Sequence, residues 1–192
     1  MRNLNLSNKT GKLFIISGPS GVGKGTLREI ALKKFQNLVY SISCTTRKPR
    51  EGEQDGVQYR FISHEKFEEY IQKNLFLEYA HVHSGFYGTL KQDVINALNA
   101  GQNVLLEIDV QGALQVLEKM PEAILIFVVP PSLEVLEQRL INRHTEGPEE
   151  LKIRLANARK ELALKDQYKY VLVNDDLEKA AEELKKIFEN EQ

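Results

Sequence analysis

The sequence is 192 residues long, enough for one domain of ordinary size with a hydrophobic core. Its hydrophobic content of 42% and charged content of 28% exclude a disordered tail, and its formal net charge of -1 provides no overall basic field that would favour nucleic acid. The single cysteine, Cys44, excludes an internal disulfide and a cysteine-based zinc site.

The apolar runs of the chain are short. Met1–Thr10 is polar and lacks the apolar centre of a signal peptide. The longest apolar run, residues 123–131, is far too short to span a bilayer. We therefore expect a cytoplasmic protein with neither nucleic acid nor membrane as a partner, and the sequence leaves a homo-oligomer open.

Short apolar runs alternate with helical patterns along the chain. Four of these runs predict buried strands, at Leu13–Ser17, Val104–Ile108, Ile124–Val129 and Tyr170–Val173, and a weaker fifth lies near Leu38–Ile42. The clearest helix is the last one, for which Asp175 or Asp176 is the expected N-cap. This alternation predicts an α/β fold with a central, mostly parallel sheet flanked by helices.

Two stretches do not fit the alternation. Thr45–Thr89 is rich in charge, glycine and tyrosine and contains a short helix at Glu65–Lys73. Asn142–Lys160 is highly charged and contains the breaker pair Gly147-Pro148 before another helix. We expect both stretches to be insertions above the strand ends, where open α/β sheets bind ligands.

A phosphate-binding loop is predicted between the first strand and the first helix. It reads Gly18, Pro19, Ser20, Gly21, Val22, Gly23, Lys24, Gly25, Thr26. Glycines at these positions let backbone N–H groups converge on phosphate oxygens at a helix N-terminus, while the lysine reaches the outer phosphates. The loop is similar to that of nucleoside monophosphate kinases and predicts ATP binding.

Gly25 stands where the strict motif has a Ser or Thr hydroxyl for Mg²⁺. Thr26 could take over that role, or nucleotide phosphates, water and an acidic side chain could hold the ion. Glu107 and Asp109 follow a buried run two residues apart, so we expect both to project from one face of a strand end. We therefore assign Thr26 and Glu107, as a hypothesis, to the surroundings of a Mg²⁺ cofactor.

A second group of motifs lies in the first insertion and beyond it. In "TTRKPREGE", Arg47 and Arg50 flank Lys48-Pro49 and could clamp a phosphate dianion. Further on come Glu78, "FYGT" at residues 86–89 and "EIDVQGA" at residues 107–113. In order and spacing, these motifs and the phosphate loop resemble the guanylate kinase family from about residue 11 onward.

The resemblance implies a P-loop kinase fold over residues 11–190. Its core would be 11–42, 91–141 and 161–190, with a GMP-binding insertion at 43–90 and a lid at 142–160. The implied reaction transfers the γ-phosphoryl of Mg·ATP to GMP, giving ADP and GDP. ATP and GMP would then be the small-molecule substrates.

The resemblance also implies roles for individual residues. The GMP phosphate would be held by Arg47, Arg50, Tyr59 and Tyr87, and guanine by Ser43, Glu78, Thr89 and Asp109. Lys24, Arg47, Arg139, Arg143 and Arg154 would stabilise the transferring phosphoryl group, and Asn174 would contact adenine. Thr89 has another reading, because Thr89 and Gln92 match a capping box for a helix beginning near Lys91.

Two alternatives stay open at this point. One is a catalytically inactive guanylate-kinase-like interaction module, which the intact Gly18, Gly23 and Lys24 argue against. The other is a related small-molecule kinase with a different acceptor, which Glu78, Thr89 and Asp109 argue against, since a carboxylate pairs with the donors of guanine and is left unpaired by adenine.

Overall fold

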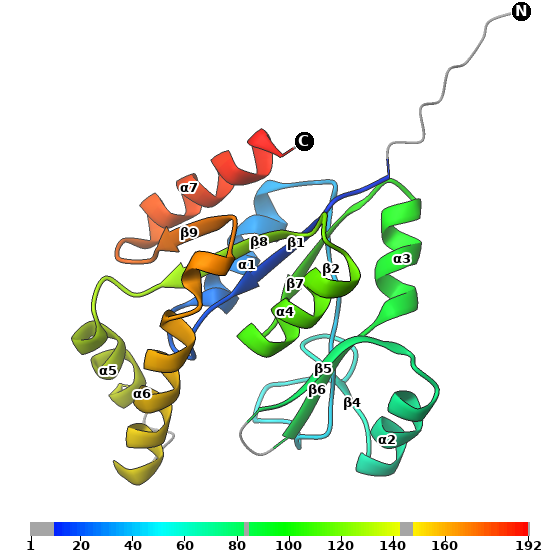
Figure 1. The fold of residues 1–192 in the computed structure, drawn as a ribbon, viewed down its shortest axis with the longest axis horizontal. Coiled ribbons are helices and arrows are strands. Elements are labelled where there is room, and N and C mark those ends of the chain that lie inside the picture. The colour runs from blue at the N-terminus through cyan, green and yellow to red at the C-terminus, as the bar shows by residue number, and fades with distance from the viewer. Residues whose placement is uncertain (1–9, 83–84, 143–147, 192) are drawn as a thin grey trace, which may run out of the picture.

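The computed structural model describes residues 10–82, 85–142 and 148–191, which form two sheets (Figure 1). The larger is a five-stranded parallel sheet in the order β2-β7-β1-β8-β9. Its strands are β1 (Leu13–Ser17), β2 (Leu38–Tyr40), β7 (Asn103–Glu107), β8 (Ile124–Val129) and β9 (Tyr170–Val173). The expected parallel sheet is therefore confirmed, and three strands have the predicted bounds.

Alternate residues of β1 enter two separate cores, one on each face of this sheet. Phe14 and Ile16 pack with residues of α1 (Lys24–Lys34) and α7 (Leu177–Asn190). Leu13 and Ile15 pack with residues of α3 (Lys91–Asn99) and α4 (Val110–Lys119). Burial on both faces explains why the strand is apolar throughout rather than alternating.

The first predicted insertion forms a second, mixed sheet in the order β4-β3-β6-β5. Its strands are β3 (Cys44–Thr45), β4 (Arg60–Phe61), β5 (Phe76–Val82) and β6 (Gly85–Leu90). Helix α2 (His64–Gln72) covers it through Phe67, which packs on Phe76 and buried Cys44. Cys44 is thus a packing residue of a small third core.

The second predicted insertion lies within a helical pair. Helix α5 (Leu133–Ile141) packs against α6 (Pro148–Leu162), and a short 3-10 helix (Lys165–Gln167) leads into β9. Figure 1 shows this pair and the small sheet projecting from the same end of the central sheet. Helix α6 continues past the predicted lid boundary at residue 160, and its Ala158 is buried in the core shared with α1 and α7.

Two details differ from the sequence-based expectations. β7 ends at Glu107, so Asp109 lies on no strand but is the N-cap of α4. The capping box at Thr89 is wrong, because Thr89 belongs to β6 and α3 begins after Leu90 without a side-chain cap.

Arg143, which the sequence placed in the lid, lies outside the described residues. No helix among the described ones is long and apolar enough to cross a bilayer.

The N-cap of α7 is Asp176, whose Oδ1 accepts a hydrogen bond of 2.9 Å from the backbone N–H of Lys179. We expect Asp176→Ala to lower the free energy of unfolding by about 1 kcal/mol, the usual cost of losing such a cap. The neighbouring exposed Asp175 makes no cap and serves as the control, so Asp175→Ala should change stability by less than about 0.5 kcal/mol. Urea unfolding of the two variants measures the difference, and equal losses would contradict the cap assignment.

Candidate functional site

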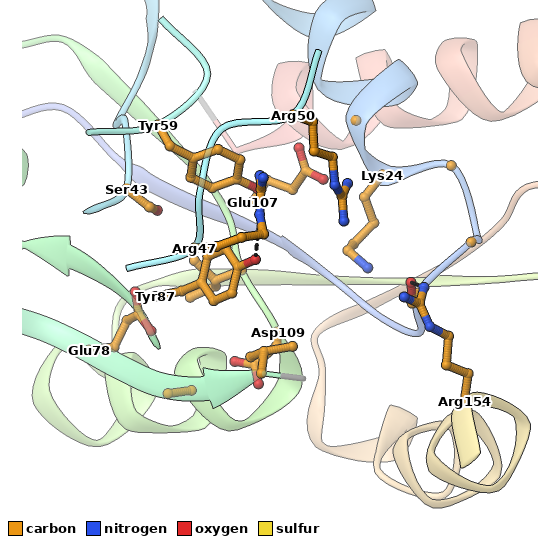
Figure 2. Close-up of a pocket in the computed structure, with 17 residues that line it drawn as sticks. Lys24, Ser43, Arg47, Arg50, Tyr59, Glu78, Tyr87, Glu107, Asp109 and Arg154 are labelled. Atoms are coloured by element: carbon orange, nitrogen blue, oxygen red, sulfur yellow. Dashed lines mark hydrogen bonds between the residues drawn. The ribbon is translucent and has the colours of Figure 1, made fainter. Parts of the chain in front are cut away.

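A cavity of about 310 Å³ opens where the central sheet, the small sheet and α6 meet (Figure 2). Four parts of the chain line it: the loop before α1, the small sheet with the β3–β4 loop, the junction of β7 with α4, and α6. Predicted site residues among the lining are Ser20, Gly21, Gly23, Lys24, Gly25, Ser43, Arg47, Arg50, Tyr59, Glu78, Tyr87, Glu107, Asp109 and Arg154. Segments far apart in sequence therefore supply one cavity.

The loop before α1 has the geometry of a phosphate cradle. Gly18, Gly21 and Gly23 have φ of 134°, 89° and 93°, a backbone region that side chains other than glycine rarely adopt. The Lys24 ammonium folds back over the loop and donates to the carbonyls of Gly18 at 2.5 Å and Pro19 at 2.9 Å. A cation and the N-terminus of α1 thus converge at one wall of the cavity.

The opposite wall carries Arg47, fixed by several contacts. Its Nε donates to the Tyr87 hydroxyl at 3.1 Å, and its guanidinium carbon lies 5.4 Å from the centre of the Tyr59 ring. Both remaining nitrogens donate to Glu53. The hydrogen bonds to Glu53, more than any other cause, raise the pKa of Arg47 further above its usual value, so the side chain stays a cation.

Arg50 contrasts with Arg47. It is exposed and lines the cavity, and no described carboxylate forms an ion pair with its guanidinium. Figure 2 shows Arg47, Tyr59 and Tyr87 grouped on one side of the cavity, with Arg50 drawn between these three residues and Lys24. The group offers two guanidiniums and two hydroxyls to an anion.

A buried carboxylate lies at the end of the cavity nearest α4. Glu78 on β5 stands opposite Thr89 on β6, and the buried Thr89 hydroxyl donates to Glu78 Oε1 at 2.6 Å. Burial raises the pKa of Glu78 to about 7, with nearby Asp109 contributing in the same direction. Burial also raises the pKa of Asp109, whose Oδ1 accepts from the Gly112 N–H at 2.8 Å. Carboxylates held this way favour a ligand with paired N–H donors.

Comparison with known proteins identifies the family of this chain. A sequence model described as "Guanylate kinase" matches residues 10–191. The chain belongs to the guanylate kinase family. A guanylate kinase of Clostridioides difficile is 48% identical over 183 residues, covering 95% of this chain and 89% of that protein. One of Caldanaerobacter subterraneus is 48% identical over 179 residues, covering 93% and 87%.

Solved structures agree with the sequence comparisons. The crystal structure of guanylate kinase from Anaplasma phagocytophilum has a TM-score of 0.79 at 33% identity and covers 96% of this chain and 88% of that one. A shikimate kinase from Bacteroides thetaiotaomicron has a TM-score of 0.50 at 14% identity, covering 93% and 98%, and shows a shared fold only. The expected P-loop kinase fold and membership of the guanylate kinase family are confirmed.

Several residues that the family resemblance singled out lie away from the cavity wall. Asn174 is buried, and its amide nitrogen donates to the carbonyl of Val22 at 2.7 Å behind the loop. A Cβ on residue 23 would come within 2.4 Å of that nitrogen, so the Asn174 amide can occupy this place only because residue 23 is a glycine. Thr26 and Arg139 also do not line the cavity, and their expected roles, like the adenine contact of Asn174, stay predictions.

Of the expected lid arginines, Arg154 lines the cavity. It projects from α6 toward the loop, with Nη1 3.4 Å from the Ser20 hydroxyl and Nη2 3.5 Å from Glu150 on its own helix (Figure 2). Both hydrogen bonds are long. This is the position from which a lid cation could meet a phosphate held by the loop.

Sequence reasoning missed three residues of the site. Glu53 pairs with Arg47, and Arg28 on α1 donates to Glu107 Oε2 at 2.8 Å. Gly112 leaves room for the acid, because a Cβ there would lie 2.3 Å from Glu78 Oε2. The signal for Glu53 was its place six residues after Arg47 in a charged loop, whereas Arg28 carried no signal because it reaches Glu107 only in the folded chain.

Proposed function

We propose that the protein is an ATP:GMP phosphotransferase, which transfers the γ-phosphoryl of ATP to GMP in purine nucleotide metabolism. The observation that carries this proposal is one cavity with a phosphate loop on one wall and a buried carboxylate with two arginines on the other. Phosphoryl transfer needs two substrates in line and cations around the moving group, more than covalent help from the protein. Membership of the family supports the same reaction.

The charged residues that line the cavity indicate which end would bind the phosphoryl donor, ATP, and which the acceptor, GMP. ATP would bind at residues 18–26, where the loop N–H groups and Lys24 face its outer phosphates. GMP would bind between residues 43 and 90, with its phosphate at Arg47, Arg50, Tyr59 and Tyr87. Residues 142–160 would form the lid, from which Arg154, with Arg139 and Arg143, would stabilise the equatorial oxygens during transfer.

Guanine would be recognised by Glu78, with Asp109, Thr89 and Ser43 around it. The guanine N1–H and 2-amino group both donate, and one carboxylate can accept from both. Adenine has an acceptor at N1 and no 2-amino group, so it would leave the buried Glu78 unpaired. A site of this type can reject the wrong base by about 10⁴–10⁵-fold.

Mg²⁺ would be held chiefly by the nucleotide. Among the described residues, no cluster of three His, Cys, Asp or Glu side chains forms a metal site. Glu107 lines the cavity beside Gly25, where a Cβ would be 3.8 Å from both of its carboxylate oxygens. It therefore fits a place near the ion, with phosphates and water as direct ligands and Arg28 fixing its orientation. Bound there, Mg²⁺ would neutralise the phosphate charge.

The proposed reaction is tested by coupling ADP release to NADH oxidation, with Mg·ATP and GMP, AMP, UMP or CMP as acceptor. We expect strong turnover with GMP and at least about 10²-fold lower kcat/KM with the others. Lys24→Ala should lower kcat by about 10²–10³-fold, because a cation at the phosphates is lost. Lys33→Ala, at the exposed far end of the same helix, is the control.

Each outcome of this assay discriminates between functions. Equal rates with AMP would overturn the guanine assignment while keeping the kinase. No turnover with any acceptor, by a protein that unfolds cooperatively, would instead favour a binding module.

The raised pKa of Glu78 predicts pH-dependent base binding. With a pKa of about 7 in the empty site, the carboxylate takes up a proton as the pH falls and loses an acceptor for guanine. We expect the Kd of guanosine to rise about tenfold from pH 8 to pH 6. Guanosine is the ligand of choice because the phosphate of GMP titrates near pH 6 itself.

The groups that act on Glu78 are Thr89, Asp109 and Lys119. Glu78→Gln should bind guanosine more weakly and with no pH dependence, as measured by calorimetry across this range. If Glu78→Gln kept the wild-type pH dependence of guanosine binding, another group would be titrating, and Asp109 would be the next candidate.

The place of Glu107 beside the loop predicts its effect on Mg²⁺. We expect Glu107→Gln to raise the Mg²⁺ concentration needed for half-maximal rate by about tenfold, the lower end of what outer-shell carboxylates contribute to metal affinity. Glu29→Gln is the matched control, because exposed Glu29 contacts the same Arg28 at 3.4 Å but does not line the cavity. An unchanged Mg²⁺ dependence in the Glu107 variant would remove Glu107 from the ion's surroundings.

A further inference from the structure

Glu53 closes the β3–β4 loop around Arg47. Its Oε1 accepts from Arg47 Nη2 and its Oε2 from Arg47 Nη1, both at 2.9 Å. The same Oε2 accepts from the backbone N–H of Arg50 at 2.7 Å, and the backbone N–H of Glu53 donates to the Arg50 carbonyl at 3.1 Å. One carboxylate thus ties the side chain of the first arginine to the backbone of the second.

The remaining Arg47 contacts show which edge of the guanidinium is used. Nη1 also donates to the Lys48 carbonyl at 2.7 Å, and Nε donates to the Tyr87 hydroxyl at 3.1 Å. Since Tyr87 accepts from Arg47, its own hydroxyl hydrogen points away from Nε, and it donates to no described residue. What faces the cavity is therefore the second Nη2 hydrogen and the Tyr87 hydroxyl hydrogen, two donors on neighbouring groups.

Glu53 itself does not line the cavity, although Arg47, Arg50 and Tyr87 do. We propose that Glu53 is a positioning residue for the acceptor phosphate: it fixes Arg47 through one edge so that the other edge, with Tyr87, meets the phosphate. This inference rests on the proposed function, because it assigns a role within the same GMP site. Glu53 would act on the phosphate end of the acceptor and leave the base end unaffected.

The two arginines then have different tasks. Arg47 is fixed before the substrate arrives, and its charge is balanced by Glu53, with side chains only 11% and 17% exposed. Arg50 is exposed and has no ion pair with a described carboxylate, so less of its charge is compensated before the ligand binds. Fixing one donor in advance lowers the entropy cost of binding, while the second adjusts to the ligand.

Burial of the pair also argues against Glu53 as a competitor that the phosphate must displace. If the phosphate replaced Glu53 on Arg47, the carboxylate would keep only the Arg50 N–H among its present donors. An ionised group left with so few partners in such a place is costly. Retention of the pair in the complex is therefore favoured.

The test measures the Kd of GMP and of guanosine by calorimetry for the wild type, Glu53→Gln and Glu51→Gln. Glutamine keeps the size of Glu53 but replaces one acceptor oxygen with a donor that faces Arg47. We expect Glu53→Gln to raise the Kd of GMP by at least about tenfold, as for a lost charge-assisted contact. The Kd of guanosine should stay within about twofold, and the KM of ATP should be unchanged.

Glu51 is the matched control, because it is an exposed acid in the same loop with no hydrogen bond or ion pair to another described residue. A double-mutant cycle with Arg47→Gln asks whether Glu53 acts through Arg47. In the Arg47→Gln background, Glu53→Gln should have little further effect on the Kd of GMP.

Each contrary result has a distinct meaning. If Glu53→Gln binds GMP as the wild type does, or binds it more tightly, Glu53 does not position the phosphate site. If GMP and guanosine weaken equally, Glu53 only maintains the loop, and the proposal is wrong. Failure of the wild type itself to bind and phosphorylate GMP would overturn the proposed function, an outcome distinct from failure of the Glu53 assignment.

Discussion

The parallel pairing of β1 with β7 determines how the phosphate loop, Glu107 and Asp109 stand relative to one another. Ile16 pairs with Glu107, and the Ile108 N–H donates to the Ile16 carbonyl at 3.3 Å, so the two strands end side by side. The phosphate loop leaves β1 one residue later, and α4 leaves β7 at its Asp109 cap. A shift of one residue in this register would turn Glu107 to the opposite face of the sheet and away from the loop.

Charges in the cavity are held by partners before any substrate is present. Lys24 donates to two backbone carbonyls, and Arg28 donates to Glu107. Arg47 donates to Glu53 and to the Tyr87 hydroxyl. Charged groups with fixed partners need little reorganisation when a transition state develops charge, which is the main electrostatic contribution to phosphoryl transfer. Arg50, which is exposed and has no ion pair with a described carboxylate, can follow a ligand.

The fold could be predicted because its signals are local. An apolar run such as Ile124–Val129 is buried on both faces and was found with its bounds, and the Gly18–Lys24 pattern fixed the loop between β1 and α1. The errors occurred where a residue's partner lies far away in sequence. Thr89 matched a capping box, but its hydroxyl instead donates a hydrogen bond to Glu78 on the paired strand β5. The hydrogen bond between strands β5 and β6 therefore replaces the local capping interaction that the sequence pattern predicted.

The site could be predicted only as far as the resemblance reached. Residues that would touch substrates were named from motifs, whereas Arg28, Glu53 and Gly112 act through Glu107, Arg47 and Glu78, and a sequence pattern does not show such partners. Gly112 illustrates the limit. In a helix a glycine is usually a weak point, yet here the lack of a Cβ leaves the space that the Glu78 carboxylate occupies.

The burial of Glu78 also bears on selectivity for the base. Moving its pKa from 4.5 to about 7 corresponds to roughly 3 kcal/mol of disfavour for the charged form in the empty site. A ligand with two N–H donors offsets part of that cost, whereas adenine does not. Rejection by 10⁴–10⁵-fold would need further contacts. The buried Thr89 hydroxyl and the carboxylate of Asp109 lie near Glu78, and the buried Ser43 lines the same cavity, so these groups are able to supply them.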